Sequence, residues 1–458
     1  MQKFIVPERD LLPRPEAQLL AALEQAAEAG AQIFARQQDT RFAGANFYPH
    51  GATKDQIAAA AQTNPLIYDP YHVVVAGNQG ELATVPYHEY YREQIKPILA
   101  ALNKAVGFAA RYDQKMHLAA IGAALQKGNH EGAVEAWLSM DPEPKVCAVI
   151  GFYDRYTDGL FNRKYAFEAW VGILDEDTTQ TCQSRVDEII DVWRKRGLKP
   201  ADMAVPKIRV RVDRTTIFSG QAALYDWGAN NLPCQRQWRE RYGSKFVIFE
   251  SNFVDKMVFG RIPLLGQTVD KDFTDADIEQ IFEAALLNYL GHEPSHAFIR
   301  RPQDEERLGG EYAMFSELYC TALGMWLALD LDIDDQLKDS VLAMHFAATA
   351  DDKISFETKG TRREYAEADL VIFNFLREKK LITIHDGRIS WKNWRELQQA
   401  LGELVHILEQ IASAGDQDDV LKLQDQYGSK TILDRLSVFK SSHKGPKTSK
   451  PLNPLLVS

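Results

Sequence analysis

The feature that most constrains this chain is a pair of histidines four residues apart, His292 and His296, with Glu293 directly after the first. On a helix, residues at i and i+4 project from the same face, so two imidazoles can share one tetrahedral metal ion. Glu293 is then placed to act as general base toward a metal-held water, and Glu317, twenty-one residues after His296, is a candidate third ligand. The pattern predicts a zinc hydrolase site with one open position.

Pro294 lies inside this motif and removes the backbone hydrogen bond to the carbonyl of Leu290, so we expect the helix to kink or loosen there. Apolar residues nevertheless recur at helical spacing on both sides of the site, which indicates two buried helices with ligands on inward faces. The competing interpretation is a pair of surface or capping histidines that bind no metal. The apolar residues are Ile281, Phe282, Ala285, Leu286, Tyr289 and Leu290 before the motif, and Leu318, Ala322, Met325 and Trp326 after Glu317.

Length and composition limit the alternatives. A chain of 458 residues is too long for one compact core and suggests two lobes, or two to three domains. No apolar run approaches a membrane span, and the N-terminus lacks the apolar core of a secretory signal, so we expect no membrane partner and a cytoplasmic location. A net charge of −11 opposes binding to nucleic acid. The cysteines, Cys147, Cys182, Cys234 and Cys320, form no CxxC pair, and we expect reduced thiols.

Periodicity predicts helices at both ends of the chain and strands between them. The fold class that follows is α+β and predominantly helical, with two lobes and a cleft between them. We expect a small mixed β core in an N-terminal lobe (1–262), a mainly helical zinc lobe (263–435) and a basic tail (436–458). The expected helices are 16–37, 88–125, 181–196 and the region from an N-cap at Thr274 to Asp434; the expected strands are 71–75, 82–85, 146–152, 167–174, 207–212 and 245–250, with a hairpin at 381–391.

Several short motifs, in this order, resemble the dipeptidyl peptidase III-like zinc metallopeptidase family, here with a short, five-residue HExxH motif. The resemblance runs from Asn46 to Asp369, most of the chain. The segments that match the family's motifs are Asn46-Phe47-Tyr48-Pro49 with Thr53-Lys54, Pro70-Tyr71, Val85-Pro86-Tyr87, Ile150 to Asp158, Ala166-Phe167-Glu168-Ala169-Trp170-Val171, Asn231-Leu232-Pro233, Gly243-Ser244-Lys245 and Glu317 to Leu327.

The resemblance implies roles residue by residue. His292, His296 and Glu317 fall on the family's metal ligands, and Glu293 on the glutamate that activates water. Tyr156 falls on a tyrosine that faces the scissile carbonyl, where a phenol can hydrogen-bond the developing oxyanion. Three further positions fall on the polar wall that holds the substrate's amino end and backbone, although surface salt-bridge partners look the same in sequence. These positions are Asp154, Glu168 and Asn231.

Three departures from the family pattern bear on the substrate. Cys234 replaces the second asparagine of the N-x-P-N block and cannot donate the same hydrogen bonds. Tyr365 stands where the family has a catalytic-site histidine, and Asp369 where it has a nearby arginine. A tyrosine can donate only a neutral hydrogen bond, so we expect peptide hydrolysis to be weak or the substrate specialised.

The sequence therefore predicts a zinc-dependent hydrolase, with one Zn²⁺ per chain, that acts on a small peptide or amide. Tyr156, together with Tyr365, is expected to stabilise the oxyanion, and Cys234 and Asp369 to border the substrate. A first alternative is a zinc hydrolase specialised for a non-peptide amide or another small polar metabolite. A second is a catalytically inactive binding or scaffold protein. The sequence does not define an oligomeric state.

Overall fold

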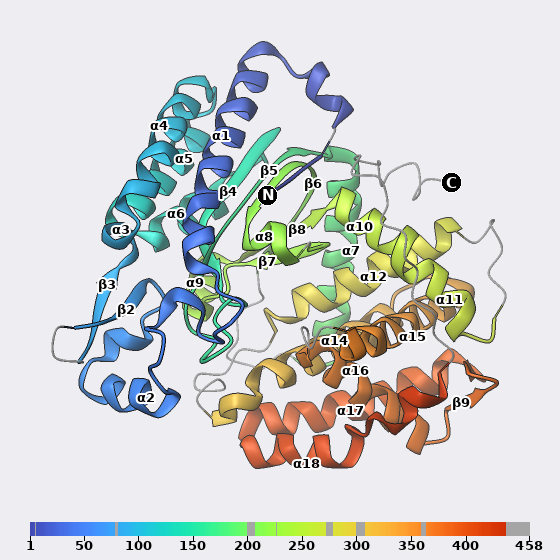
Figure 1. Cartoon of the computed structure of the whole chain (residues 1–458). Helices are drawn as coiled ribbons and strands as arrows, with labels where there is room; N and C mark the ends of the chain where they lie inside the picture. Colours follow the sequence, from blue (N-terminus) through green and yellow to red (C-terminus); the bar gives the residue numbers. More distant parts are fainter. Residues whose placement is uncertain are drawn as a thin grey trace.

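The computed structural model describes residues 1–4, 6–77, 81–198, 207–225, 227–271, 278–298, 307–358 and 363–436. A central sheet lies between helices on both faces, and a second, helical part packs below it in Figure 1. None of the helices among the described residues is both long and apolar enough to span a bilayer.

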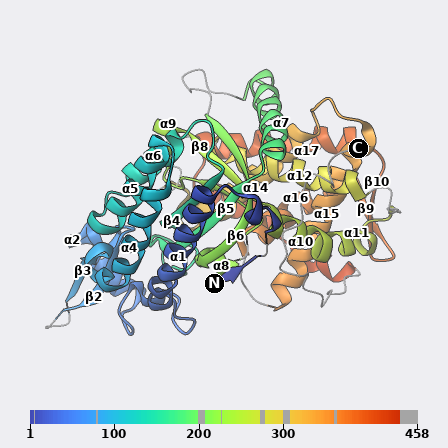
Figure 2. The same cartoon turned by 90° about the horizontal axis from the view of Figure 1, so that it is seen from above.

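The N-terminal helices cover one face of the sheet. The longest, α1 (Arg14–Gln37), turns a buried stripe of leucines and alanines toward α4 and toward strands β4, β5 and β6. Figure 2 shows α1, α4 and α5 side by side along this face. The other elements of this part are α2 (Lys54–Thr63), α3 (Tyr87–Tyr90), α4 (Arg92–Phe108), α5 (Tyr112–Lys127), α6 (His130–Ser139) and the hairpin of β2 (His72–Ala76) and β3 (Leu82–Pro86).

The main sheet has the order β4-β5-β6-β8-β7, with β1 added beside β6. Neighbouring strands are antiparallel except for β6 and β8, which run parallel. The polar residues Asp154, Glu168 and Asn231 come from three of these strands, β4, β5 and β7. The strands are β1 (Gln2–Lys3), β4 (Val146–Asp154), β5 (Ala166–Leu174), β6 (Ile208–Gly220), β7 (Ala229–Leu232) and β8 (Ser244–Phe249).

Strand β8 shows how one sheet serves two cores. Side chains alternate between the faces of a strand. Val247 and Phe249 belong to the core under the N-terminal helices, whereas Phe246 and Ile248 belong to the core shared with the C-terminal helices. Because both faces are covered, β4, β5 and β8 are buried along their whole length.

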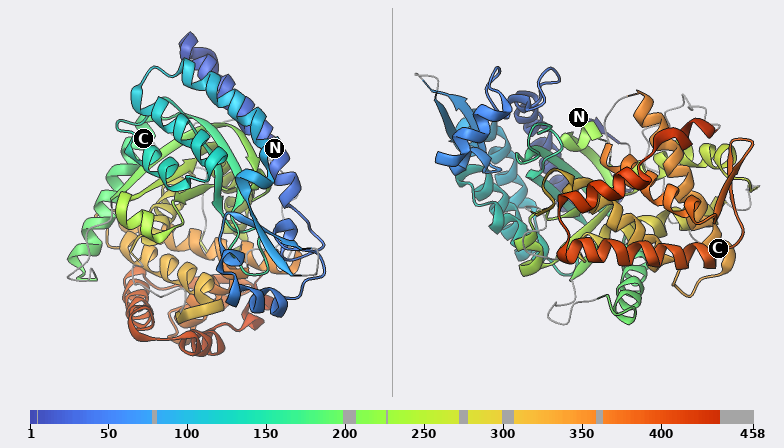
Figure 3. Two further views of the ribbon diagram at one scale, coloured as in Figure 1. Left: turned by 90° about the vertical axis from the view of Figure 1, so that its left-hand side faces the viewer. Right: turned by 90° about the horizontal axis from the view of Figure 1, so that it is seen from below.

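The second core is built from helices that follow the sheet in sequence, with α7 beside them (Figure 3). Helix α14 lies in the middle and contacts α12, α16 and α17. The elements of this core are α7 (Glu176–Lys195), α10 (Glu250–Lys256), α11 (Ile262–Thr268), α12 (Ile278–Ser295), α14 (Tyr312–Ala328), α15 (Asp335–Thr358), α16 (Arg363–Glu378), α17 (Trp394–Ala414), α18 (Gln417–Tyr427) and the hairpin of β9 (Ile382–His385) and β10 (Arg388–Trp391). Two short helices, α8 (Gln221–Tyr225) and α9 (Arg236–Tyr242), contribute instead to the core under the N-terminal helices.

The structure confirms the predicted fold class, a mostly helical two-lobed α+β protein with a mixed sheet. Two parts of the sheet were missed, the two-residue β1 and the four-residue β7, because each is too short to show a period. The expected N-cap at Thr274 lies outside the described residues, as does the tail beyond Leu436. The boundaries at 262 and 435 stay predictions.

Candidate metal centre

The motif lies at the end of α12, where this helix crosses α14. Gly291 and Gly324 meet at the crossing, so closely that a Cβ on Gly324 would lie 2.6 Å from the backbone nitrogen of His292. Helix α12 ends at Ser295, one residue after Pro294, and His296 continues it with a bond from its N–H to the carbonyl of Glu293, 3.3 Å long. The helix was expected to kink or loosen at Pro294. It instead ends in a tighter turn, closed by a bond three residues back, and both histidines remain on the same side.

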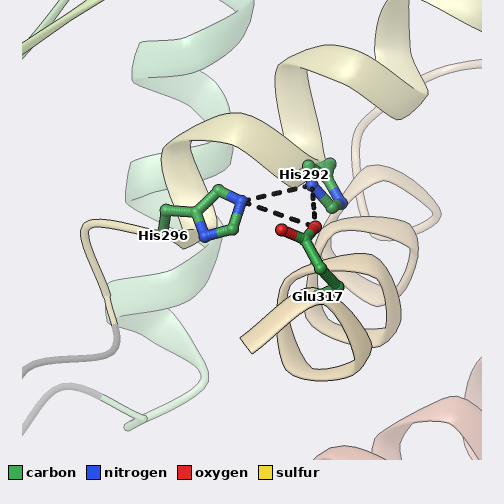
Figure 4. Close-up of side chains that lie close together, drawn as sticks. All are labelled: His292, His296 and Glu317. Atoms are coloured by element: carbon green, nitrogen blue, oxygen red, sulfur yellow. Dashed lines mark hydrogen bonds and ion pairs between the residues drawn. The ribbon is translucent and has the colours of Figure 1, made fainter. Parts of the chain in front are cut away.

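His292, His296 and Glu317 converge on one point (Figure 4). The Nε2 atoms of the two histidines are 3.3 Å apart. Glu317 Oε2 lies 3.2 Å from Nε2 of His292 and 3.8 Å from Nε2 of His296. Among the described residues, this is the one cluster of three metal-binding side chains whose ligand atoms lie within 4.8 Å of one another.

This triangle fits a tetrahedral zinc ion. Bonds of about 2.0–2.1 Å at tetrahedral angles separate neighbouring ligand atoms by about 3.3–3.4 Å. The observed separations of 3.2, 3.3 and 3.8 Å lie around that value. Glu317 Oε2 is also buried and faces the two imidazoles, and burying a carboxylate is costly unless a cation neutralises it.

The ring nitrogens that face away from the triangle have partners on α14. Nδ1 of His292 lies 3.1 Å from the hydroxyl of Thr321. Nδ1 of His296 lies 3.3 Å from the hydroxyl of Ser316 and 3.2 Å from the sulfur of Cys320. Helix α14 therefore supplies both Glu317 and the groups that contact the two imidazoles from behind.

Burial and neighbouring charges set the protonation of the acidic groups here. Burial raises the pKa of Glu293 to about 7, and the nearby His292 opposes the rise. For Glu317, burial also acts to raise the pKa, but His296, the hydrogen bond with His292 and a hydrogen bond from Tyr365 bring it below its ordinary value. Glu317 is thus the carboxylate held in its charged form.

The hydroxyls of Tyr156 and Tyr365 meet beside Glu317. Tyr156 follows β4 in the N-terminal part and Tyr365 lies on α16 in the helical part, and their hydroxyl oxygens are 3.4 Å apart. Tyr156 is 46% exposed as a residue, although its hydroxyl is shielded where it meets that of Tyr365. The Tyr365 hydroxyl, followed by burial, raises the pKa of Tyr156, which keeps it a proton donor in hydrogen bonds.

Asp154 and Glu168 form a buried acidic pair. Asp154 accepts hydrogen bonds from the Cys234 thiol, at 3.2 Å, and from the amide of Asn230, at 3.3 Å. Glu168 is fully buried; one of its oxygens accepts a bond from Gln221, and the other has no hydrogen-bond partner among the described residues. Burial raises the pKa of both carboxyls, and Asp154 adds to the rise at Glu168.

Asn231 and Asp369 each contact a group within the protein. The side-chain amide of Asn231 donates to the backbone carbonyl of Glu293 at 2.7 Å, so it ties the sheet to the motif. Asp369 is buried on α16, one turn after Tyr365, with its carboxylate 4.0 Å from Nδ1 of His345. Their roles toward a substrate stay predictions.

Sequence reasoning missed five residues that contact the site: Asn230, Gln221, Ser316, Cys320 and Thr321. A signal was present for the last three. Ser316 precedes Glu317, and Cys320 and Thr321 follow it by one helical turn, so all four share one face of the helix.

By fold and site, this is a two-lobed α+β protein with an HExxH-type motif and a glutamate from a second helix. The profile of Peptidase family M49 matches residues 57–192. The chain is 23% identical over 383 residues to Nudix hydrolase 3 of Arabidopsis thaliana; the match covers 79% of this chain and 48% of that protein. The chain thus spans about half the length of this curated relative.

Two solved structures share the fold. Dipeptidyl-peptidase III from Corallococcus sp. strain EGB superposes with a TM-score of 0.80 at 20% identity, over 94% of this chain and 91% of that one. DPP III from Caldithrix abyssi gives 0.77 at 19% identity, over 95% and 94%. The predicted resemblance to the dipeptidyl peptidase III family is thereby confirmed.

Proposed function

We propose that this protein is a zinc-dependent hydrolase of the dipeptidyl-peptidase type, with one zinc ion held by His292, His296 and Glu317. The observation that carries the proposal is the triangle of ligand atoms, 3.2–3.8 Å on each side, with Glu293 adjacent to it. When bound, zinc would supply a Lewis acid that favours attack of water on an amide carbonyl.

Glu293 then takes the proton that the attacking water loses and passes it to the leaving nitrogen as the C–N bond breaks. Its pKa of about 7 suits both steps, because the group can accept and release a proton near neutral pH. Asn231 keeps this segment in place through its bond to the carbonyl of Glu293. Tyr156 donates a hydrogen bond to the carbonyl oxygen as negative charge develops there.

The acidic pair supports a substrate with a free amino end. An ammonium group bound beside Asp154 and Glu168 would pair with the Glu168 oxygen that has no partner and would offset the cost of burying two carboxyls. The Cys234 thiol donates a hydrogen bond to Asp154 Oδ1 at 3.2 Å. An amine that binds Asp154 must therefore share this oxygen with the thiol or use the other one.

A second candidate is hydrolysis of a non-peptide amide or another small polar metabolite. It is favoured by the two tyrosine hydroxyls, whose oxygens are 3.4 Å apart. By the resemblance, Tyr365 falls where the family has a histidine, and a tyrosine cannot carry positive charge beside the reacting carbonyl. Such a site would stabilise a peptide transition state less well.

The test combines metal analysis with a panel of dipeptidyl naphthylamides and the substitution Glu293→Gln. We expect about one zinc per chain and hydrolysis by the wild type. The Glu293→Gln variant should keep zinc but lose hydrolysis, because the change removes a proton acceptor and no ligand. Absence of any transition metal, or nearly unchanged activity of the variant, would contradict the proposal. Turnover of non-peptide amides alone would favour the second candidate.

A further inference from the structure

The two ligand imidazoles are supported from behind by uncharged groups. In metal sites, the ring nitrogen that does not bind the metal usually donates its N–H to a carboxylate, a backbone carbonyl or water. Here the partners are the hydroxyl of Thr321 for His292, at 3.1 Å, and the hydroxyl of Ser316 and the thiol of Cys320 for His296, at 3.3 and 3.2 Å.

Metal binding at the triangle would set which ring nitrogen carries the proton. Nε2 of each histidine faces Glu317 and the other histidine, so metal binding there needs an unprotonated Nε2 and a proton on Nδ1 (Figure 4). A hydroxyl oxygen or a thiol sulfur can accept that N–H, and both hold the ring at a fixed angle. Cys320 is fully buried and Ser316 is 9% exposed, so water competes little for these contacts.

The third ligand follows the same pattern. A hydrogen bond from the Tyr365 phenol acts on Glu317 and contributes to lowering its pKa, after the effects of burial and of the two histidines. Each of the three candidate ligands therefore has a hydroxyl or thiol partner.

We infer that Thr321, Ser316 and Cys320 are positioning residues that orient His292 and His296 for zinc through an uncharged outer shell. The inference rests on the proposed function, since it needs zinc at the triangle. Its consequence is a site whose affinity depends on neutral hydrogen bonds: removing such partners typically weakens metal binding about 10–100-fold.

The measurement is zinc affinity, by competition with a chromogenic chelator, on the full-length protein. Thr321→Val should bind zinc about 10–100-fold more weakly, while Thr321→Ser, which keeps the hydroxyl, should bind as the wild type does. The matched control is Thr349→Val, because Thr349 is a buried helical threonine whose hydroxyl donates to the carbonyl of His345 rather than contacting an imidazole. It should leave zinc affinity unchanged.

A second set tests His296 in the same way. Cys320→Ala alone should have a small effect because the Ser316 hydroxyl remains, whereas Ser316→Ala with Cys320→Ala should weaken zinc binding about tenfold or more. Cys182→Ala, another fully buried cysteine, on α7, is the control. If Thr321→Val fails to fold, these variants at His296 still test the inference.

The outcomes separate the two proposals. A wild type that binds zinc, with variants that bind it equally well, overturns the inference and leaves the proposed function intact. Equal weakening by Thr349→Val or Cys182→Ala also overturns it, since the effect would then come from general packing. A wild type that binds no zinc overturns the proposed function itself.

Discussion

The contact between Gly291 and Gly324 should set the geometry of the metal centre, and Gly324→Ala tests this. The new Cβ would lie 2.6 Å from the nitrogen of His292 and from the carbonyl carbon of Gly291, where ordinary contacts begin at 3.4 Å. Backbone atoms cannot turn aside as a side chain can, so helices α12 and α14 must separate by about 0.8 Å.

Two effects of different size follow. Overpacking of a core typically costs about 1–3 kcal/mol of unfolding free energy. Metal sites tolerate deviations of about 0.2 Å in ligand distance, so an opening several times larger should lower zinc affinity at least tenfold, or about 1.4 kcal/mol. We expect Gly324→Ala to show both losses, in denaturant unfolding of the metal-free protein and in chelator competition.

Two alanine controls isolate the geometric effect. Gly107→Ala lies in helix α4 with open space around the new Cβ, so it should stabilise by about 0.4–1 kcal/mol and leave zinc affinity unchanged. Gly402→Ala in α17 crowds the indole of Trp326 at 2.9 Å, so it should reduce stability without moving a ligand. The reasoning is refuted if Gly324→Ala loses stability but binds zinc as tightly as the wild type.

Three further predictions concern the substrate side and pH. Tyr156→Phe should lower kcat/KM about a hundredfold or more with zinc content unchanged, since one oxyanion donor is worth about 2.7–4 kcal/mol; an unaffected rate would remove Tyr156 from the mechanism. Tyr365→His combined with Cys234→Asn should raise turnover of dipeptidyl naphthylamides, and no gain would favour the non-peptide candidate. Burial lowers the pKa of His130 to about 3, against about 6.5 in the unfolded chain. Above pH 6.5 the histidine is neutral in both states and does not oppose folding. As the pH falls from 6.5 to 3, the unfolded chain binds the proton more readily, so the unfolding free energy decreases. In urea unfolding, the wild type should therefore lose about 1.4 kcal/mol more unfolding free energy between pH 7.5 and pH 5.5 than the His130→Phe variant does, and equal losses would contradict this reasoning.

The metal triangle and the long helices could be predicted from sequence because their signals are local. The spacing of His292 and His296 and the apolar period around them lie within single helices, and Glu317 lies on the next described long helix. The hairpin around Asp386 and Gly387 was predictable for the same reason: both residues adopt positive φ, which a tight turn of this type requires.

Contacts between distant segments could not be predicted in this way. Asn231 bonds the carbonyl of Glu293, sixty-two positions away, and only the packing of β7 against α12 brings them together. Periodicity also gave no sign that β6 would extend to Gly220, because its second half contains Arg214, Thr215 and Thr216, which are paired or bonded within the fold. Polar residues in a strand look like a loop until their partners are known.

The placement of Asp369 connects the departures from the family pattern to the metal centre. The resemblance implies an arginine at this position in the family, and the buried Asp369 has the opposite charge, on the helix that also carries Tyr365. Asp369 acts to raise the pKa of His292, although burial is the largest influence on that pKa and opposes it. Together with Glu293, Glu317 and the pair at Asp154, it makes the surroundings of the triangle rich in carboxylates. A divalent cation and an ammonium group are the partners that such surroundings favour, which agrees with the proposed zinc site and with the proposed binding of a free amino end.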